Sequence, residues 1–218
     1  MGKRRLSKEA LISEAKRFAQ SESKHNEPSL YGITDGKAVG TYLEHKFQAS
    51  LHEKYAYVEG SSAKGIDFPE IKVDLKVTSV RQPQSSCPFK SARQKIYGLG
   101  YSLLVFVYEK TDDDRVKTAN LRIAHTVYVD EELTGDYQTT CGLRKIIDNG
   151  GNTDDVIAFF AERLLPVSDI ECEELAQEVL AEPPMIGYLT ISNALQWRLQ
   201  YGRVIQEAGN VEGIVRVV

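Results

Sequence analysis

The chain has 218 residues, of which 42% are hydrophobic and 27% are charged, and its formal net charge is −4. This length suits one domain, and the composition is typical of a soluble globular protein. No segment approaches the roughly 18 consecutive apolar residues that a membrane-spanning helix needs, which argues against a membrane protein.

The N-terminus and the cysteines indicate where the protein works. Residues 1–5 are basic but lead into a charged helical pattern, so we expect no export signal and a cytoplasmic location. Cys87, Cys141 and Cys172 are widely spaced and form no CxxC pair. This spacing argues against both a disulfide framework and a structural zinc site.

Helices are expected first. Ser7 can cap a helix that runs to about residue 19. Apolar residues at every fourth position from Val39 to Leu51 predict a second helix over about 37–55. The segment 22–36 between them is rich in Ser, Asn, Pro and Gly, which favours a loop.

Strands follow in the middle of the chain. Apolar and polar residues alternate over 71–78, which predicts a strand with one apolar face. The apolar run 103–108 predicts a central strand buried on both faces, and 121–129 predicts another strand. A loop is expected around 82–84.

The rest of the chain is mainly helical in its pattern. Helices are predicted over about 91–97, 143–148, 154–165, 171–181 and 192–208, with strand-like pieces at 186–191 and 214–218. We therefore expect a mixed α/β fold in one domain, 1–218, with its core at about 35–130 and a helical C-terminal part, 131–218.

One segment carries residues that suit metal-dependent hydrolysis of a phosphodiester. Asp74 and Lys76 are two apart on the predicted strand, so their side chains project from the same face. Asp67 precedes them across a Pro-containing turn that could bring its carboxylate beside Asp74. Two carboxylates can hold a hard cation such as Mg²⁺, and a lysine beside them can orient or deprotonate the attacking water.

The tripeptide alone has little weight, because acidic-x-Lys recurs along the chain. The other copies begin at Glu14, Glu22, Asp35, Glu44 and Glu70. Judged on the residues alone, a catalytic centre and a structural salt bridge between Asp74 and Lys76 are equally supported.

The stretch from Asp35 to Ser79 resembles the MutH-like branch of the PD-(D/E)xK, restriction-endonuclease-like nucleases. The resemblance lies in the segments 37–44, 60–62, 67–70 and 73–78. It implies a central mixed β-sheet flanked by α-helices.

The resemblance also implies the site. Asp67, Asp74 and Glu44 would bind the metal, and Lys76 would complete the catalytic set. Glu53 on the same predicted helix as Glu44 is an equal candidate by composition, and only the resemblance selects Glu44. MutH itself has glutamate where this chain has Asp74.

Arg and Gln are the side chains that best read guanine and adenine edges in the major groove of DNA. The candidates that follow the site in the sequence are Arg81, Gln82, Gln84, Lys90 and Arg93. The alternative is that they form a solvated loop and helix face. The segment 196–203 is a second candidate, although Trp197 with Leu195 and Leu199 is more typical of a packing stripe.

The acidic net charge is only a weak objection to a DNA partner, because a nuclease gathers carboxylates at its metals and needs one positive face. We expect a Mg²⁺-dependent type II restriction enzyme that cuts double-stranded DNA at specific sites as a homodimer. No glycine loop indicates a nucleotide cofactor. The alternatives are a MutH-like nicking endonuclease of DNA repair and an inactive DNA-binding module of the same fold.

Overall fold

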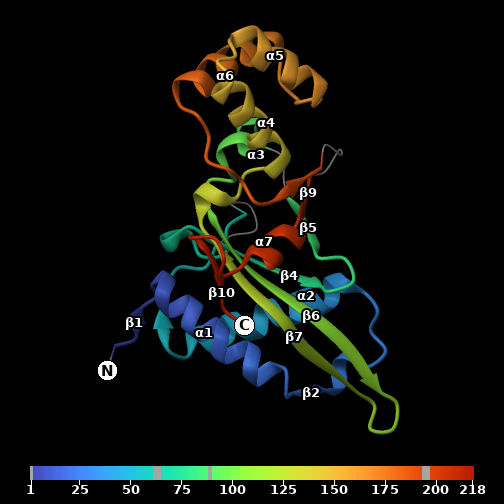
Figure 1. The fold of residues 1–218 in the computed structure, drawn as a ribbon. Helices are drawn as coiled ribbons and strands as arrows, with labels where there is room; N and C mark the ends of the chain where they lie inside the picture. The colour runs from blue at the N-terminus through green and yellow to red at the C-terminus, as the bar shows by residue number, and fades with distance from the viewer. Residues whose placement is uncertain (1, 61–64, 88–89, 193–196) are drawn as a thin grey trace.

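The computed structural model describes residues 2–60, 65–87, 90–192 and 197–218 (Figure 1). Most of the turn expected at 60–62 therefore lies outside the described residues. The helices are α1 (Lys8–Glu22), α2 (Gly36–His52), α3 (Arg93–Tyr97), α4 (Tyr137–Asp148), α5 (Thr153–Glu162), α6 (Asp169–Ala181) and α7 (Gly202–Glu207). The strands are β1 (Arg4–Arg5), β2 (Asn26–Glu27), β3 (Tyr55–Ala56), β4 (Val73–Ser79), β5 (Gln84–Cys87), β6 (Ser102–Asp113), β7 (Thr118–Val129), β8 (Thr190–Ile191), β9 (Trp197–Gln200) and β10 (Ile214–Arg216).

A mixed sheet forms the centre of the protein. Its strands are hydrogen-bonded in the order β10, β7, β6, β4. The short β2 also pairs with β7, at residues 119–120 of that strand. Strands β6 and β7 are antiparallel, whereas β4 runs parallel to β6 and lies at the edge. Residues 103–107 of β6 are at most 1% exposed, which confirms the predicted central strand. The expected mixed α/β fold is confirmed as well.

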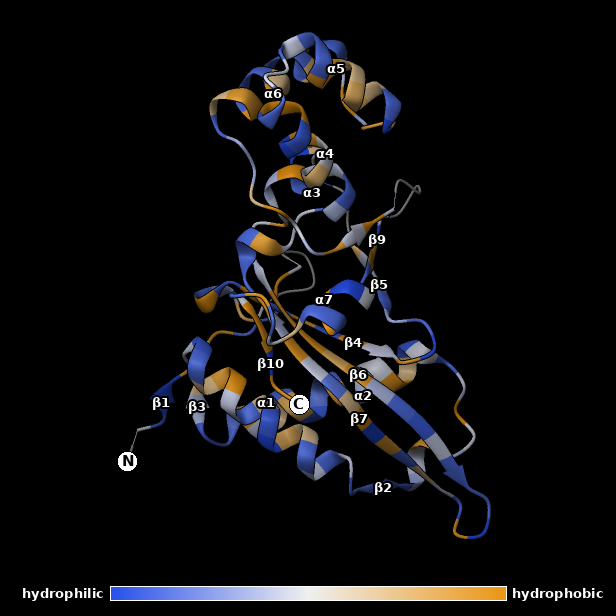
Figure 2. Cartoon of the chain, in the orientation of Figure 1, coloured by the Kyte–Doolittle hydropathy of each residue, from blue (hydrophilic) through white to orange (hydrophobic). Residues whose placement is uncertain are grey.

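Two apolar cores lie on opposite faces of this sheet. On one face, α1 and α2 cover β4, β6 and β7, and Phe18, Phe47 and Phe106 form an aromatic cluster with ring centroids 5.1–5.6 Å apart. On the other face, β8, β9, α7 and β10 bury the odd-numbered side chains of β6. Figure 2 shows hydrophobic residues on β6 in the middle of the molecule. The sheet thus has α2 on one side of β4 and the β5–β9–β8 sheet on the other.

Helices α3 to α6 form a projecting lobe with a core of its own (Figure 1). Leu143, Val156, Phe160 and Leu175 are among its buried residues. Most of the helices predicted in the C-terminal part, 131–218, lie in this lobe. Strand β10 from the same part joins the central sheet instead. No helix among the described residues is both long and apolar enough to cross a membrane.

Most predicted elements are confirmed within a few residues. Ser7 caps α1, since its Oγ accepts a hydrogen bond from Ala10 N at 3.2 Å. The predicted helix over 192–208 is wrong: its described part forms β9 and then the short α7. The expected loop at 82–84 ends earlier than predicted, because Gln84 already begins β5.

Gly40 lies on α2 opposite Val77 of β4, where the absence of a side chain would permit close approach of helix and sheet. A Cβ built on Gly40 lies 4.0 Å from Val77 Cβ and from its backbone oxygen, which is ordinary van der Waals contact. The close packing therefore does not require glycine here.

We predict that Gly40→Ala stabilises the protein by about 0.5–1 kcal/mol, because alanine loses less backbone entropy in a helix than glycine does. Urea unfolding of both proteins measures the difference. Gly187→Ala is the contrasting control, since its Cβ would lie 2.2 Å from the backbone of Gly135. Destabilisation by Gly40→Ala would show that α2 and β4 pack more tightly than the structure indicates.

Candidate active site

Asp74 and Lys76 project from the same face of β4, as the alternation predicted. Asp74 Oδ2 lies 2.6 Å from Lys76 Nζ, and the two side chains are 3% and 22% exposed. Despite this ion pair, Asp74 Oδ2 is buried and accepts no hydrogen bond of normal geometry from the described residues. The contact that holds this oxygen is therefore the charge pair with Lys76 rather than a hydrogen bond of normal geometry.

Asp67 reaches the same place because the chain folds back before β4. Phe68 and Val73 exchange two backbone hydrogen bonds, at 2.9 and 3.2 Å, around the 3₁₀ turn Pro69–Ile71. Lys72 closes this turn in the left-handed region, with φ 52°. Asp67 Oδ2 then accepts a hydrogen bond from Leu75 N at 2.8 Å. The carboxylate thus occupies the free edge of β4, where another strand would otherwise pair.

Glu44 approaches from α2. Burial raises the pKa of its carboxyl, and the charge of Asp67 raises it further, whereas Lys76 opposes the shift. Gln48, one turn along α2, lies 3.5 Å from Asp67 Oδ1 through its Nε2. Glu53 follows the end of α2 and is exposed. It lies nine residues from Glu44, about 13 Å along a helix, so α2 presents Glu44 to the other carboxylates and leaves Glu53 outside.

The four charged groups act on one another. Burial raises the pKa of Asp74 to about 7, the nearby Asp67 adds to the rise, and Lys76 opposes it. For Lys76, burial lowers the pKa, but Asp74, Asp67 and Glu44 together outweigh burial and raise it. Lys76 is therefore a protonated donor among three carboxyl groups.

This donor set suits a hard divalent cation held in an open site. The described residues contain no group of three or more His, Cys, Asp or Glu side chains that could enclose a metal ion. Mg²⁺ is commonly held by one or two carboxylates, with waters and substrate phosphates completing its octahedron. The carboxylates of Asp67 and Asp74 fit that mode of binding.

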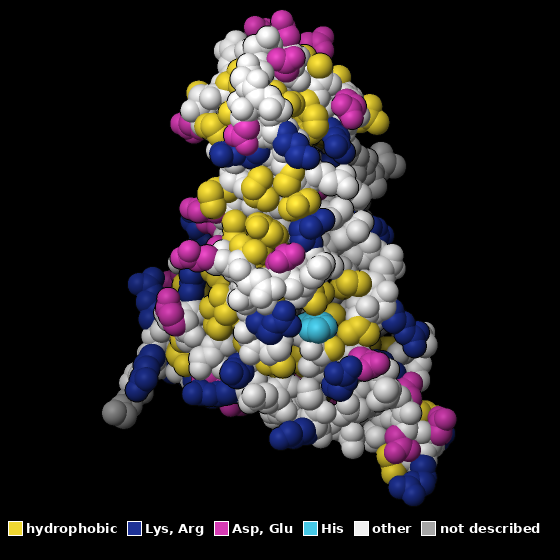
Figure 3. Space-filling model, in the orientation of Figure 1, with side chains coloured by type: hydrophobic (Ala, Val, Ile, Leu, Met, Phe, Trp, Pro, Cys, Tyr) yellow, Lys and Arg dark blue, Asp and Glu magenta, His cyan; other side chains and the backbone are white. Residues whose placement is uncertain are grey.

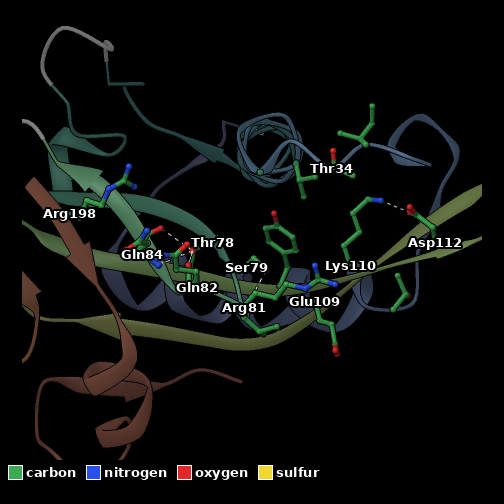
Figure 4. A pocket seen from close by; sticks show the side chains of 16 residues that line it. Thr34, Thr78, Ser79, Arg81, Gln82, Gln84, Glu109, Lys110, Asp112 and Arg198 are labelled. Atoms are coloured by element: carbon green, nitrogen blue, oxygen red, sulfur yellow. Dashed lines mark hydrogen bonds and ion pairs between the residues drawn. The ribbon is translucent and has the colours of Figure 1, made fainter. Parts of the chain in front are cut away.

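A groove of about 680 Å³ runs from the C-terminal end of β4 along β6 (Figure 4). Three of the predicted DNA contacts line it: Arg81, Gln82 and Gln84. Lys110 and Arg198 line it too. Arg198 belongs to the second candidate segment, 196–203, whereas Lys110 was not predicted and carries no recognisable signal in the sequence.

The structure separates the other two predicted contacts from this groove. Lys90 and Arg93 lie beside the helical lobe, where they line a cavity with residues of α6. Arg93 forms an ion pair there with Glu178. The five candidates thus form two groups, and only the first lies at the C-terminal end of β4, the strand that carries Asp74 and Lys76.

Further residues around Asp74 were not singled out in the sequence. Asp74 contributes to the raised pKa of Cys87, Tyr101 and Tyr201, although burial is the largest cause for each. Cys87 Sγ lies 3.7 Å from the Tyr101 hydroxyl.

Comparisons with known proteins identify the chain's relatives. No solved structure matches it. The family model described as type II restriction enzyme NspV matches residues 5–216. The type II restriction enzyme NspV of Nostoc sp. (strain ATCC 29411 / PCC 7524) is 62% identical over 212 residues, which cover 97% of this chain and 96% of that relative. The chain therefore belongs to the NspV family of type II restriction enzymes, which are site-specific DNA endonucleases.

Proposed function

We propose that this endonuclease hydrolyses both strands of duplex DNA in a Mg²⁺-dependent reaction centred on Asp67, Asp74 and Lys76, with Glu44 in support. The observation that carries the proposal is the chain reversal before β4. It brings a second carboxylate to a buried aspartate that is already paired with a lysine. A purely structural salt bridge needs no such second acid.

The residues divide the work by their chemistry. Asp67 and Asp74 would hold Mg²⁺, which when bound polarises the scissile phosphate and favours ionisation of water. The raised pKa of Lys76 keeps its ammonium protonated, so it is suited to orient the attacking water and to stabilise negative charge on the phosphate. Glu44 keeps Lys76 in place electrostatically and offers a further carboxylate to a second cation.

We assign the site to the MutH-like branch of the PD-(D/E)xK nucleases. Its support is the order of the residues: a glutamate on α2, an aspartate before the turn, and an acid and a lysine on β4. Membership in a restriction enzyme family favours double-strand cleavage over the nicking reaction of DNA repair. The complete set of carboxylates and lysine favours an active enzyme over an inactive binding module.

We propose that DNA lies along the groove at the end of β4, where Arg81, Gln82 and Gln84 contact it. Lys90 and Arg93 would contact DNA farther out, and Arg93 would exchange its Glu178 partner for a phosphate. A homodimer would place two such sites on a palindromic target, because a two-fold axis of the protein then matches that of the DNA.

Loss of Lys76 or Asp74 should abolish cutting. We predict that Lys76→Ala and Asp74→Ala lower the cleavage rate by about 100-fold or more, the usual cost of removing a catalytic donor or acid-base group. Digestion of phage DNA with Mg²⁺ or with EDTA measures the effect. Lys72→Ala is the matched control, since Lys72 is an exposed lysine just before β4 whose ion pair is with Glu131. Discrete fragments from Lys76→Ala at the wild-type rate would refute the assignment.

The pKa of Asp74 predicts a pH-dependent stability in EDTA. Because the pKa of Asp74 is about 7 in the folded protein against an ordinary value of 3.8, its contribution to stability is full below about pH 4, falls as pH rises from about 4 to 7, and is lost above 7. We expect wild type to lose up to about 3 kcal/mol relative to Asp74→Asn between pH 5 and 8. Urea unfolding at both pH values tests this, and parallel losses in the two proteins would contradict it.

Mg²⁺ should reverse that loss if Asp74 is a ligand. At pH 8 we predict that Mg²⁺ raises the melting temperature of wild type, because a ligand that binds only the folded state stabilises it. Asp74→Asn should show a much smaller rise, and Lys72→Ala should behave like wild type. Equal rises in wild type and Asp74→Asn would place the cation elsewhere, whatever the cleavage assay shows.

A further inference from the structure

Strands β5 and β9 form an antiparallel ribbon whose two faces differ completely. The inward side chains are buried or bonded inside the protein: Trp197 and Leu199 are at most 2% exposed, and the Ser85 hydroxyl bonds the Tyr201 hydroxyl. The outward side chains alternate with them and are polar: Gln84, Ser86, Arg198 and Gln200. Trp197 and Leu199 thus pack inward, as a packing stripe would, while Arg198 and Gln200 alternate with them and face outward.

The register brings the outward side chains into two rows. Gln84 lies directly opposite Gln200, and Ser86 lies directly opposite Arg198. On the other side of β9, Thr190 of β8 lies opposite Gln200 and extends the first row. Side chains directly opposite each other on one face are about 5 Å apart at Cβ. The outer face therefore presents an arginine and two glutamines within a small area and, among the described residues of these strands, no carboxylate.

Thr78 connects this ribbon to the cutting centre. Its hydroxyl donates to the backbone oxygens of Gln82 and Gln84, at 3.2 and 3.0 Å, and Gln84 N lies 3.0 Å from the same Oγ1. Thr78 stands two residues after Lys76 on the same face of β4, about 7 Å along the strand. Tyr201 N also donates to Pro83 O at 2.8 Å, which fixes the end of β9 to the same loop.

The ribbon borders the groove beside the site. Arg198 and Gln84 line the same end of it as Thr78 and Gln82 (Figure 4). On the face of the molecule that Figure 3 shows, Lys and Arg side chains are dispersed and do not form one basic patch. What distinguishes the ribbon is a set of side chains with directional hydrogen-bonding groups, held on paired strands.

We propose that the outer face of the β5–β9–β8 sheet enters the major groove of DNA and reads bases there, with Arg198 on a guanine and Gln84 and Gln200 on adenines. The inference rests on the proposed function, because it needs DNA to lie along this groove. A two-stranded ribbon fits the major groove, Arg pairs in bidentate fashion with guanine O6 and N7, and Gln pairs with adenine N6 and N7. Thr78 is a positioning residue: it sets the distance between the bases that the ribbon reads and the phosphodiester bond that the enzyme cuts.

The test uses the full-length enzyme and an oligonucleotide duplex that carries the site wild type cuts in phage DNA. A set of duplexes replaces each base pair of that site in turn. Cleavage rates are measured for wild type, Arg198→Lys and Gln84→Ala. Arg115→Lys is the matched control, since Arg115 is an exposed arginine on the hairpin between β6 and β7. Melting temperatures confirm that each variant is folded.

A base-reading Arg198 gives one pattern. Arg198→Lys keeps the charge but loses the planar fork, so its rate on the cut site should fall by about 5- to 150-fold, with discrimination lost at one base-pair position. Gln84→Ala should lose discrimination at a different position, and Arg115→Lys should match wild type. If Arg198→Lys keeps wild-type rates on every duplex, its guanidinium group does not contribute to recognition and the proposal fails. If all duplexes slow equally, Arg198 contacts phosphate rather than a base, and the proposal fails as well.

The two proposals fail separately. The cutting assignment depends on Lys76→Ala, and the reading assignment depends on the pattern across substituted duplexes. If Arg198→Lys changes discrimination between duplexes while Lys76→Ala stays active, the catalytic assignment is wrong and the base-reading assignment holds. If discrimination is unchanged while Lys76→Ala is inactive, the catalytic assignment holds and the base-reading assignment is wrong.

Discussion

The hydrogen bond from Leu75 N to the Asp67 carboxylate determines the arrangement of the whole site. Strand β4 lies at the edge of the central sheet, so its outward backbone donors need partners. A neighbouring strand would satisfy them but would cover the edge. A short reversal that ends in an aspartate satisfies the donor and leaves the edge open, with a carboxylate fixed beside Asp74.

The residues of this site reduce the stability of the folded protein when Asp74 is ionised. Asp74 is buried beside a second acid, and its pKa of about 7 shows that the folded protein disfavours its ionised form even with Lys76 at 2.6 Å. The large apolar cores on both faces of the sheet hold the backbone in place despite this cost. Because the site disfavours its own negative charge, a bound cation would stabilise it strongly. The electrostatic cost of burying Asp74 therefore favours metal binding.

Local patterns predicted what depends on local geometry. The alternation around 73–78 indicated which face Asp74 and Lys76 share, and Pro69 indicated the turn that returns Asp67 to them. The choice between Glu44 and Glu53 depended on how α2 lies against β4, which no spacing along the helix reveals. Lys90 and Arg93 follow Arg81 closely in the sequence, yet α3 packs into the helical lobe and takes them away from the groove.

The error at 192–208 has a definite cause. Apolar residues at 197 and 199 fit a strand and also fall within a helical window, and α7 begins only three residues later. A helix would have spread Arg198 and Gln200 around its circumference. The strand aligns them on one face and places them beside Gln84, which is more than a hundred residues earlier in the chain.

The proposed cutting centre and the proposed reading ribbon both depend on β4, and this shared strand would couple reading to cutting. Lys76 and Thr78 are separated by one residue of a strand that is paired along its length with the buried β6. A path this short and rigid leaves little freedom between the scissile phosphate and the bases that the ribbon contacts. Cleavage requires reacting groups to be placed within a fraction of an ångström, and a misplacement of 1 Å can cost about 100-fold in rate. A ribbon seated on the wrong sequence would therefore displace the centre from the phosphate, and discrimination would appear in the cutting rate beyond what binding alone provides.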